Sequence, residues 1–114
     1  ELKEKNVTLV ITVDCGTRDI EAIKHGKNLG IDVIITDHHA VPEIIPEEAI
    51  AIINPKRKDS KYPFPQLAGA GVAYKLVHAL LLKISQNQEE VFATLTRYID
   101  FASLGTVADC MPLT

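Results

Sequence analysis

Acidic and imidazole side chains stand directly after two short apolar runs, where their types and spacing could support metal chemistry. Asp14 follows the first run, and the tripeptide Asp37–His39 follows the second. Two adjacent histidines add nothing to a helix cap, yet imidazole is a good metal ligand, and carboxylate oxygens suit hard divalent cations. The pattern therefore indicates a divalent-metal site. For Asp14 taken alone, a helix-capping role is an equally good interpretation.

These residues need elements that bring strand ends together, and the sequence predicts such elements. Leu9–Val13 and Asp32–Thr36 are apolar, β-branched runs typical of strands buried on both faces, and between them lies a helix that Thr17 caps and Gly30 ends. A strand, a helix and a strand in this order form a βαβ unit with parallel strands and a right-handed crossover. Ala49–Ile53 predicts a third strand. Because parallel strands end at one edge of a sheet, the residues that follow them should converge.

The second half of the chain is predicted to be helical. The segment 55–71 is loop-like, with several prolines and charges. Apolar residues recur at helical spacing over 72–84 and again over 91–102, which predicts two amphipathic helices. Gly105 is expected to end the second helix.

Length and composition bound the class of protein. The chain has 114 residues, of which 46% are hydrophobic and 24% charged, and its net charge is −3. These values are typical of one soluble globular domain and argue against a generically basic nucleic-acid coat. The longest apolar run, 49–53, is far below the roughly 20 residues of a membrane span. We expect one α/β domain over residues 1–114, with a polar lead-in at 1–6, built as a three-layer open parallel sheet with flanking helices.

Four segments form an ordered set of motifs. Val13–Gly16 and Thr36–His39 carry the two acidic sites, while Leu67–Leu76 and Leu104–Leu113 lie in the helical half. The set resembles the DHH phosphoesterases, and the last two segments look like their RecJ branch, the single-strand-specific 5′→3′ DNA exonucleases. The resemblance implies a partial DHH domain carrying motifs II to IV. The first strand and Asp-x-Asp motif of the family are absent upstream of Asp14.

The same resemblance implies a role for each site residue. Asp14 would bridge two Mn²⁺ or Mg²⁺ ions, and His38 and Asp109 would complete the second ion. His39 would face the scissile phosphate or a metal, and Asp37 would orient a histidine. Paired ions stabilise the attacking and leaving oxygens of phosphodiester hydrolysis. The resemblance also implies a cytoplasmic protein without a membrane segment. It would act on single-stranded DNA in repair and recombination, with a helicase and a single-strand-binding protein as partners.

A basic loop within this acidic chain, together with two glycines after it, is a candidate for DNA contact. The candidate nucleic-acid-binding residues are Lys56, Arg57, Lys58, Lys61, Tyr62, Gly69 and Gly71. The cations could meet phosphates, the aromatic ring could stack on a base, and the bare amides at the glycines could face a phosphate. A solvated loop and a closely packed turn are the alternatives, and the sequence leaves them open.

Three functions remain open from the sequence. The first is part of a metal-dependent exonuclease that degrades single-stranded DNA from its 5′ end by a two-ion mechanism. The second keeps the family but acts on cyclic dinucleotides, short oligonucleotides or pyrophosphate, and the segment Gly105–Pro112 argues against it. The third is a binding or structural module without turnover. We expect the isolated chain to behave in this third way, binding Mn²⁺ weakly and self-associating through an exposed sheet edge.

Overall fold

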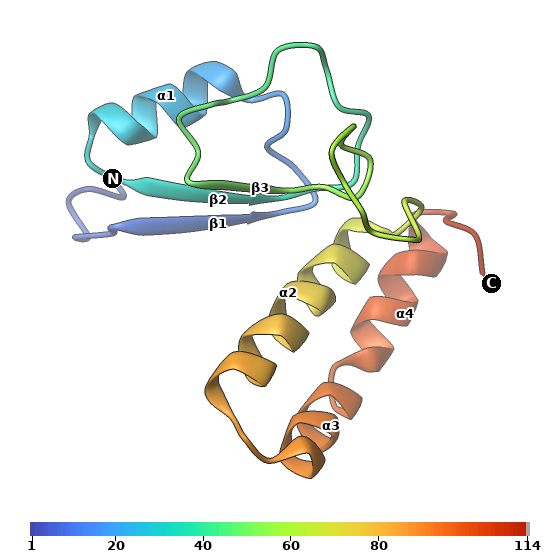
Figure 1. Cartoon of the computed structure of the whole chain (residues 1–114). Helices are drawn as coiled ribbons and strands as arrows, with labels where there is room; N and C mark the ends of the chain where they lie inside the picture. The colour runs from blue at the N-terminus through green and yellow to red at the C-terminus, as the bar shows by residue number, and fades with distance from the viewer. Residues whose placement is uncertain (114) are drawn as a thin grey trace.

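A small parallel sheet carries a helical unit in the computed structural model, which describes residues 1–113 (Figure 1). The strands are β1 (Leu9–Val13), β2 (Asp32–Thr36) and β3 (Ala51–Ile53). They lie in the order β1-β2-β3, and both pairs are parallel. The register aligns Val13 with Thr36, so β1 and β2 end at the same level, as predicted. The third strand begins at Ala51 rather than Ala49.

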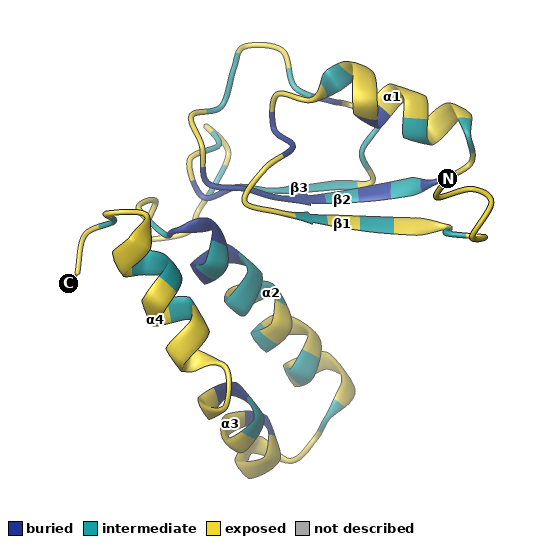
Figure 2. Ribbon diagram, turned by 180° about the vertical axis from the view of Figure 1, so that it is seen from behind, coloured by how far each residue is buried: buried dark blue, intermediate teal, exposed yellow. Residues whose placement is uncertain are grey.

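The chain has four helices over residues 1–113, and helices contact the sheet on both of its faces. The four helices are α1 (Ile20–Asn28), α2 (Gly69–Ile84), α3 (Gln88–Thr96) and α4 (Ile99–Ala108). Helix α1 covers one face, whereas α2 contacts β1 and β2 from the other, and α3 and α4 pack along α2 (Figures 1 and 2). The predicted three-layer α/β architecture is confirmed. None of these four helices has the length and apolar character needed to cross a membrane.

The core lies between α1 and the central strand, so the burial of the strands is uneven. Ile23, Val33 and Ile35 form its buried centre, and Val10 of β1 packs against them. The expectation that β1 is buried on both faces is wrong, because its residues alternate and Ile11 is 45% exposed. The physical reason is that little of the second face of β1 is covered by a helix. The start of α2 packs near the carboxyl end of β1, and the rest of α2 runs away from the sheet (Figure 2).

The start of α1 also differs from the prediction. Asp19, not Thr17, occupies the N-cap position, and no side chain caps the helix there. Thr17 is fully buried, and its N–H donates to Asp37 Oδ2 at 2.9 Å. The end of the helix is as predicted, because Gly30 adopts a left-handed φ of 75° just after it. Oγ1 of Thr17, the atom that would cap the helix, instead accepts a hydrogen bond from Nδ2 of Asn54 at 3.3 Å.

The segment 91–102, predicted as one helix, belongs to two helices in the structure, α3 and α4. A tight turn at Arg97 and Tyr98 separates α3 from α4, and their N–H groups bond three residues back rather than four. Gly105 lies inside α4 instead of ending it. A Cβ at Gly105 would lie 2.5 Å from the Cβ of Ala70 in α2. This glycine therefore serves close packing between the two helices rather than helix termination.

Candidate metal centre

Asp14 lies at the carboxyl end of β1, where a strand and a helix fix it together. Its φ of 66° is left-handed, a conformation that aspartate tolerates better than most residues. Its N–H donates to the carbonyl of Thr36 at 2.9 Å. Gly69, the first residue of α2, packs directly against it, since a Cβ there would lie 2.5 Å from the Cβ and Cγ of Asp14. Only glycine leaves room for this carboxylate.

His38 is buried, and its imidazole lies close to two carboxylates. Its Nε2 lies 3.0 Å from Asp14 Oδ1 and 3.2 Å from Asp109 Oδ2, yet neither of its ring nitrogens makes a hydrogen bond. A buried polar atom without a hydrogen-bond partner is costly, so this arrangement calls for a ligand. Neighbouring ligands of an octahedral ion at about 2.1 Å are themselves about 3 Å apart, which matches these separations. The three side chains fit a divalent cation.

The electrostatic setting of this cluster also favours a cation. Asp109 occupies the C-cap position of α4, where the ends of the helix carbonyls add partial negative charge to the carboxylate. Asp14, His38 and His39 each offer one ligand atom, and these atoms all lie within 4.8 Å of one another. The structure thus brings together residues from β1, the segment after β2 and the end of α4. Their roles as ligands stay a prediction.

Asp37 stands behind the cluster and holds His39. Its side chain is only 3% exposed, and its Oδ1 accepts hydrogen bonds from Nδ1 of His39 at 2.7 Å and from the N–H of His38 at 2.8 Å. Burial raises the pKa of Asp37, but hydrogen bonds from Thr17 and His39 outweigh it and hold that pKa well below its usual range. With Nδ1 engaged, His39 keeps Nε2 available for a metal or a phosphate.

Thr17 and Asn54 support the segment that carries Asp37 and His39. The sequence analysis did not single out either as a site residue. Asn54 follows β3 and is 4% exposed, and its Nδ2 donates to the carbonyl of His39 at 3.0 Å and to Oγ1 of Thr17 at 3.3 Å. The sequence carried a signal for Asn54, because it follows the third strand just as Asp14 and Asp37 follow the first two. No local pattern marks Thr17, whose partners are distant in sequence.

Comparison with known proteins identifies the family. The N-terminal domain of the DHH family matches residues 2–106. The chain belongs to the DHH family. It is similar to the single-stranded-DNA-specific exonucleases RecJ of Bacillus subtilis, at 43% identity over 112 residues, and of Salmonella typhimurium, at 40% over 118 residues.

These alignments cover nearly all of this chain but a small part of each relative. They include 98% and 99% of this chain, against 13% and 20% of the two relatives. A crystal structure of exonuclease RecJ bound to manganese superimposes with a TM-score of 0.73 at 29% identity, covering 98% of this chain and 27% of the other. The resemblance to the RecJ branch is therefore confirmed, and a solved relative of this fold holds manganese.

The DHH signature of this chain divides into an inner and an outer part. Asp37 points inward and is satisfied entirely by hydrogen bonds within the protein. His38 and His39 lie within 4.8 Å of Asp14 through their ligand atoms. A hollow of about 350 Å³ beside them, lined in part by Asp14, Arg18 and His39, leaves room for a substrate. Arg18, exposed at this hollow, is a further cation that the sequence analysis did not single out.

The predicted DNA-binding residues of this DHH chain are not equivalent. Lys56, Lys58 and Lys61 are exposed, as a solvated or a DNA-facing loop would require. Arg57 is engaged within the protein: its Nε and Nη2 donate to Asp59 at 2.9 and 2.7 Å. Its hydrogen bond also holds the pKa of Asp59 below the usual range. Arg57 therefore braces the loop, and its contact with DNA stays a prediction.

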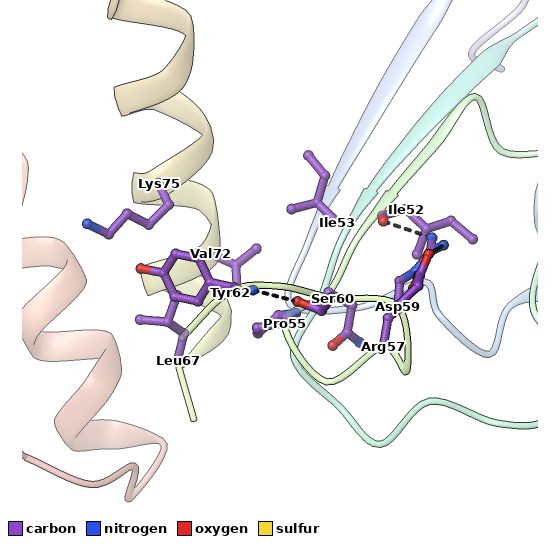
Figure 3. A pocket seen from close by; sticks show the side chains of 11 residues that line it. Ile52, Ile53, Pro55, Arg57, Asp59, Ser60, Tyr62, Leu67, Val72 and Lys75 are labelled. Carbon is purple, nitrogen blue, oxygen red and sulfur yellow. Dashed lines mark hydrogen bonds and ion pairs between the residues drawn. The ribbon is translucent and has the colours of Figure 1, made fainter. Parts of the chain in front are cut away.

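The two glycines favour the packing interpretation over phosphate binding. The space above Gly69 is taken by Asp14, and a Cβ at Gly71 would lie 3.2 Å from the side chain of Leu67. Both glycines are buried at the start of α2. Tyr62 differs from them, because its side chain borders a cavity (Figure 3).

Proposed function

We propose that this chain is the metal-binding part of an exonuclease that hydrolyses single-stranded DNA from its 5′ end. The observation that carries the proposal is the buried His38 Nε2, which lies without a hydrogen bond between Asp14 and Asp109. Its similarity to single-stranded-DNA-specific exonucleases supports the substrate class, and the manganese in the RecJ crystal structure supports the metal class.

Each residue of the site has a distinct task in this proposal. Asp14, His38 and Asp109 hold Mn²⁺ or Mg²⁺, whose carboxylate and imidazole ligands they supply. When bound, two such ions provide Lewis-acid stabilisation of the attacking and leaving oxygens of the phosphodiester. Asp37 keeps Nδ1 of His39 protonated, so that Nε2 of His39 faces the metal or the scissile phosphate.

For the 114-residue chain alone, we propose weak Mn²⁺ binding and no measurable hydrolysis. The ligand side chains that cluster within residues 1–113 are Asp14, His38, His39 and Asp109. Four side chains of this kind suit one divalent ion better than two, since each hard cation takes about six oxygen or nitrogen ligands. Turnover by the purified chain would contradict this part of the proposal.

A substrate panel tests the assignment. The intact protein that carries this chain is incubated with 5′-labelled single-stranded DNA, duplex DNA, a cyclic dinucleotide and pyrophosphate, each in Mn²⁺ and in EDTA. We expect Mn²⁺-dependent release of mononucleotides from the single strand alone. Hydrolysis of pyrophosphate or the cyclic dinucleotide without cleavage of the single strand would move the protein to the second family activity.

Metal binding is measured separately, on the 114-residue chain. Paramagnetic Mn²⁺ should broaden the imidazole proton signals of His38 and His39 at lower concentrations than those of His25, which lies exposed on α1. Equal broadening of all three histidines would show that the ion has no site at the cluster.

A further inference from the structure

A cavity of about 390 Å³ opens between β3, the loop that follows it and the start of α2 (Figure 3). Its apolar walls are formed by Ile52, Ile53, Pro55, Leu67 and Val72. The volume lies within the range of small-molecule pockets, which combine apolar walls with a few well-placed polar groups. The sequence analysis predicted contact with DNA in this loop but did not predict a cavity.

An aromatic ring and a cation stand together at one side of this cavity. The ring of Tyr62 lies beside Val72 and Leu67, and Lys75 extends from α2 near its hydroxyl end (Figure 3). Tyr62 is 39% exposed, so part of its surface is accessible. Its N–H donates to Oγ of Ser60 at 3.2 Å, which fixes the turn that presents it.

The cavity lining carries one uncompensated positive charge. Arg57 and Asp59 both line it, but their ion pair at 2.7 Å neutralises them. Lys75 forms no ion pair with any carboxylate of residues 1–113, so its charge is available to an anionic ligand. An aromatic side chain beside a free cation is the combination that recognises a base and its phosphate.

The cavity adjoins the candidate metal centre through its own walls. The carbonyl of Ile53, a wall residue, accepts a hydrogen bond from the N–H of Asp37 at 3.0 Å. Asn54, another wall residue, donates to the carbonyl of His39 at 3.0 Å. The wall of the cavity is therefore hydrogen-bonded directly to the backbone of the segment that carries His39.

We propose that the cavity holds one base of a single-stranded DNA substrate, with Tyr62 stacking on the base and Lys75 contacting a backbone phosphate. This inference rests on the proposed function and adds a binding site beside the metal centre. Stacking accepts any base, and the amide of Asn54 is already engaged within the protein. The site is therefore expected to grip the strand without reading its sequence.

Thymidine 5′-monophosphate tests occupancy of the cavity directly on the 114-residue chain. By NMR, it should shift the ring signals of Tyr62 and the methyl signals of Val72, while Tyr98, an exposed tyrosine outside this cavity, stays unchanged. Deoxyribose 5-phosphate, which lacks the base, should leave Val72 unaffected. No shift at Tyr62, or equal shifts from the sugar phosphate, would overturn the inference.

Variants of the intact protein test the two contacts, using oligothymidylate in EDTA so that no hydrolysis occurs. Tyr62→Ala should weaken binding about tenfold, and Tyr62→Phe should change it less than twofold, because the ring is retained. Lys75→Met should weaken binding and reduce its salt dependence. Lys83→Met, an exposed lysine further along α2, is the matched control and should bind normally. Unchanged binding in both Tyr62→Ala and Lys75→Met would overturn the inference.

The two proposals fail in distinguishable ways. If thymidine 5′-monophosphate shifts Tyr62 but the intact protein does not cleave single-stranded DNA in Mn²⁺, the proposed function is wrong and the base site stands. If cleavage occurs and Tyr62→Ala leaves KM unchanged, the base site is wrong and the proposed function stands. Thermal melting of each variant checks that a loss of binding is not a loss of folding.

Discussion

The sheet unit (residues 7–55) and the helical unit (α2, α3 and α4) are held together by different means. Within residues 1–113, the buried polar residues all belong to the sheet unit: Thr17, Thr36, Asp37, His38 and Asn54. The buried residues of the helical unit are instead glycines and apolar residues, namely Gly69, Gly71, Val72, Val91 and Leu95. Both units expose large apolar side chains, among them Ile11 in the sheet unit and Phe92, Phe101 and Leu104 in the helical unit. Helix α4 has no buried residue, although Asp109 caps its end.

This difference teaches which part of the molecule specifies the site. Buried polar groups that find their partners, as those of Thr17, Asp37 and Asn54 do, hold side chains in one geometry. The hydrophobic effect that holds the helices side by side is non-directional. We therefore expect changes in the sheet unit to affect metal binding most, and changes in the helical unit to affect stability and association.

The largest effect is expected from Asp14→Asn. Asparagine tolerates a left-handed φ, so the substitution removes the charge while keeping the backbone. Mn²⁺ affinity, measured by isothermal titration calorimetry, should fall by about 100-fold, because losing a ligand costs at least as much as losing its supporting hydrogen bond. The control is Asp32→Asn, whose side chain is 50% exposed against 53% for Asp14 and lies at the opposite end of the strands.

Asp109→Asn tests whether the helical unit contributes less to metal binding than the sheet unit does. Because α4 has no buried residue, its end can adjust, and the loss of Mn²⁺ affinity should be smaller, about tenfold. Equal losses in Asp14→Asn and Asp109→Asn would contradict the view that the sheet unit dominates the site.

Asp37→Asn should destabilise the fold by about 2 kcal/mol. The amide keeps the shape of the side chain, but it cannot accept all the hydrogen bonds that Thr17, His38 and His39 donate to the carboxylate. Urea unfolding measures the change. Asp59→Asn, which breaks an exposed ion pair with Arg57, should change stability far less. Comparable losses in the two variants would argue against the buried network as the source of rigidity.

The same Gly→Ala substitution should have opposite signs in the two units. Gly105→Ala places a methyl group against Ala70 and should cost about 1–3 kcal/mol through overpacking, a loss that Ala70→Gly should largely restore. A Cβ at Gly26, inside α1, would meet only ordinary contacts at 3.7 and 3.9 Å, so Gly26→Ala should stabilise the chain by about 0.5–1 kcal/mol. Urea unfolding measures the stability of Gly105→Ala, of the double variant with Ala70→Gly, and of Gly26→Ala. A destabilised Gly26→Ala would contradict the expected difference in sign.

The smallest effect on stability is expected at the exposed apolar surfaces. Phe101, 70% exposed on α4, and Ile11, 45% exposed on β1, should each accept lysine with a change below about 0.5 kcal/mol. Sedimentation velocity should show that the unmodified chain self-associates and that either lysine weakens this association. An effect of Ile11→Lys alone would assign the contact to the sheet. A monomer at every concentration would refute self-association.

Local pattern predicted the parts of this protein that depend on neighbours in sequence. The two longer strands, their parallel order and the polar residues at their ends follow from apolar runs and turn residues alone. The errors arose where distant partners compete. Oγ1 of Thr17 accepts from Asn54 instead of capping a helix, and Gly105 packs on Ala70 instead of ending one. Neither partner can be recognised from residues nearby.

For the candidate site, the sequence by itself determined the chemistry: carboxylates and imidazoles after parallel strands, in an order that matches the DHH family. Only the tertiary structure decided their spatial relations. It placed Asp109, from the far end of the chain, 3.2 Å from His38, and it opened a cavity that Tyr62 and Lys75 both line. The physical reason is that side-chain types follow from the chain itself, whereas distances between them depend on packing that closes long loops.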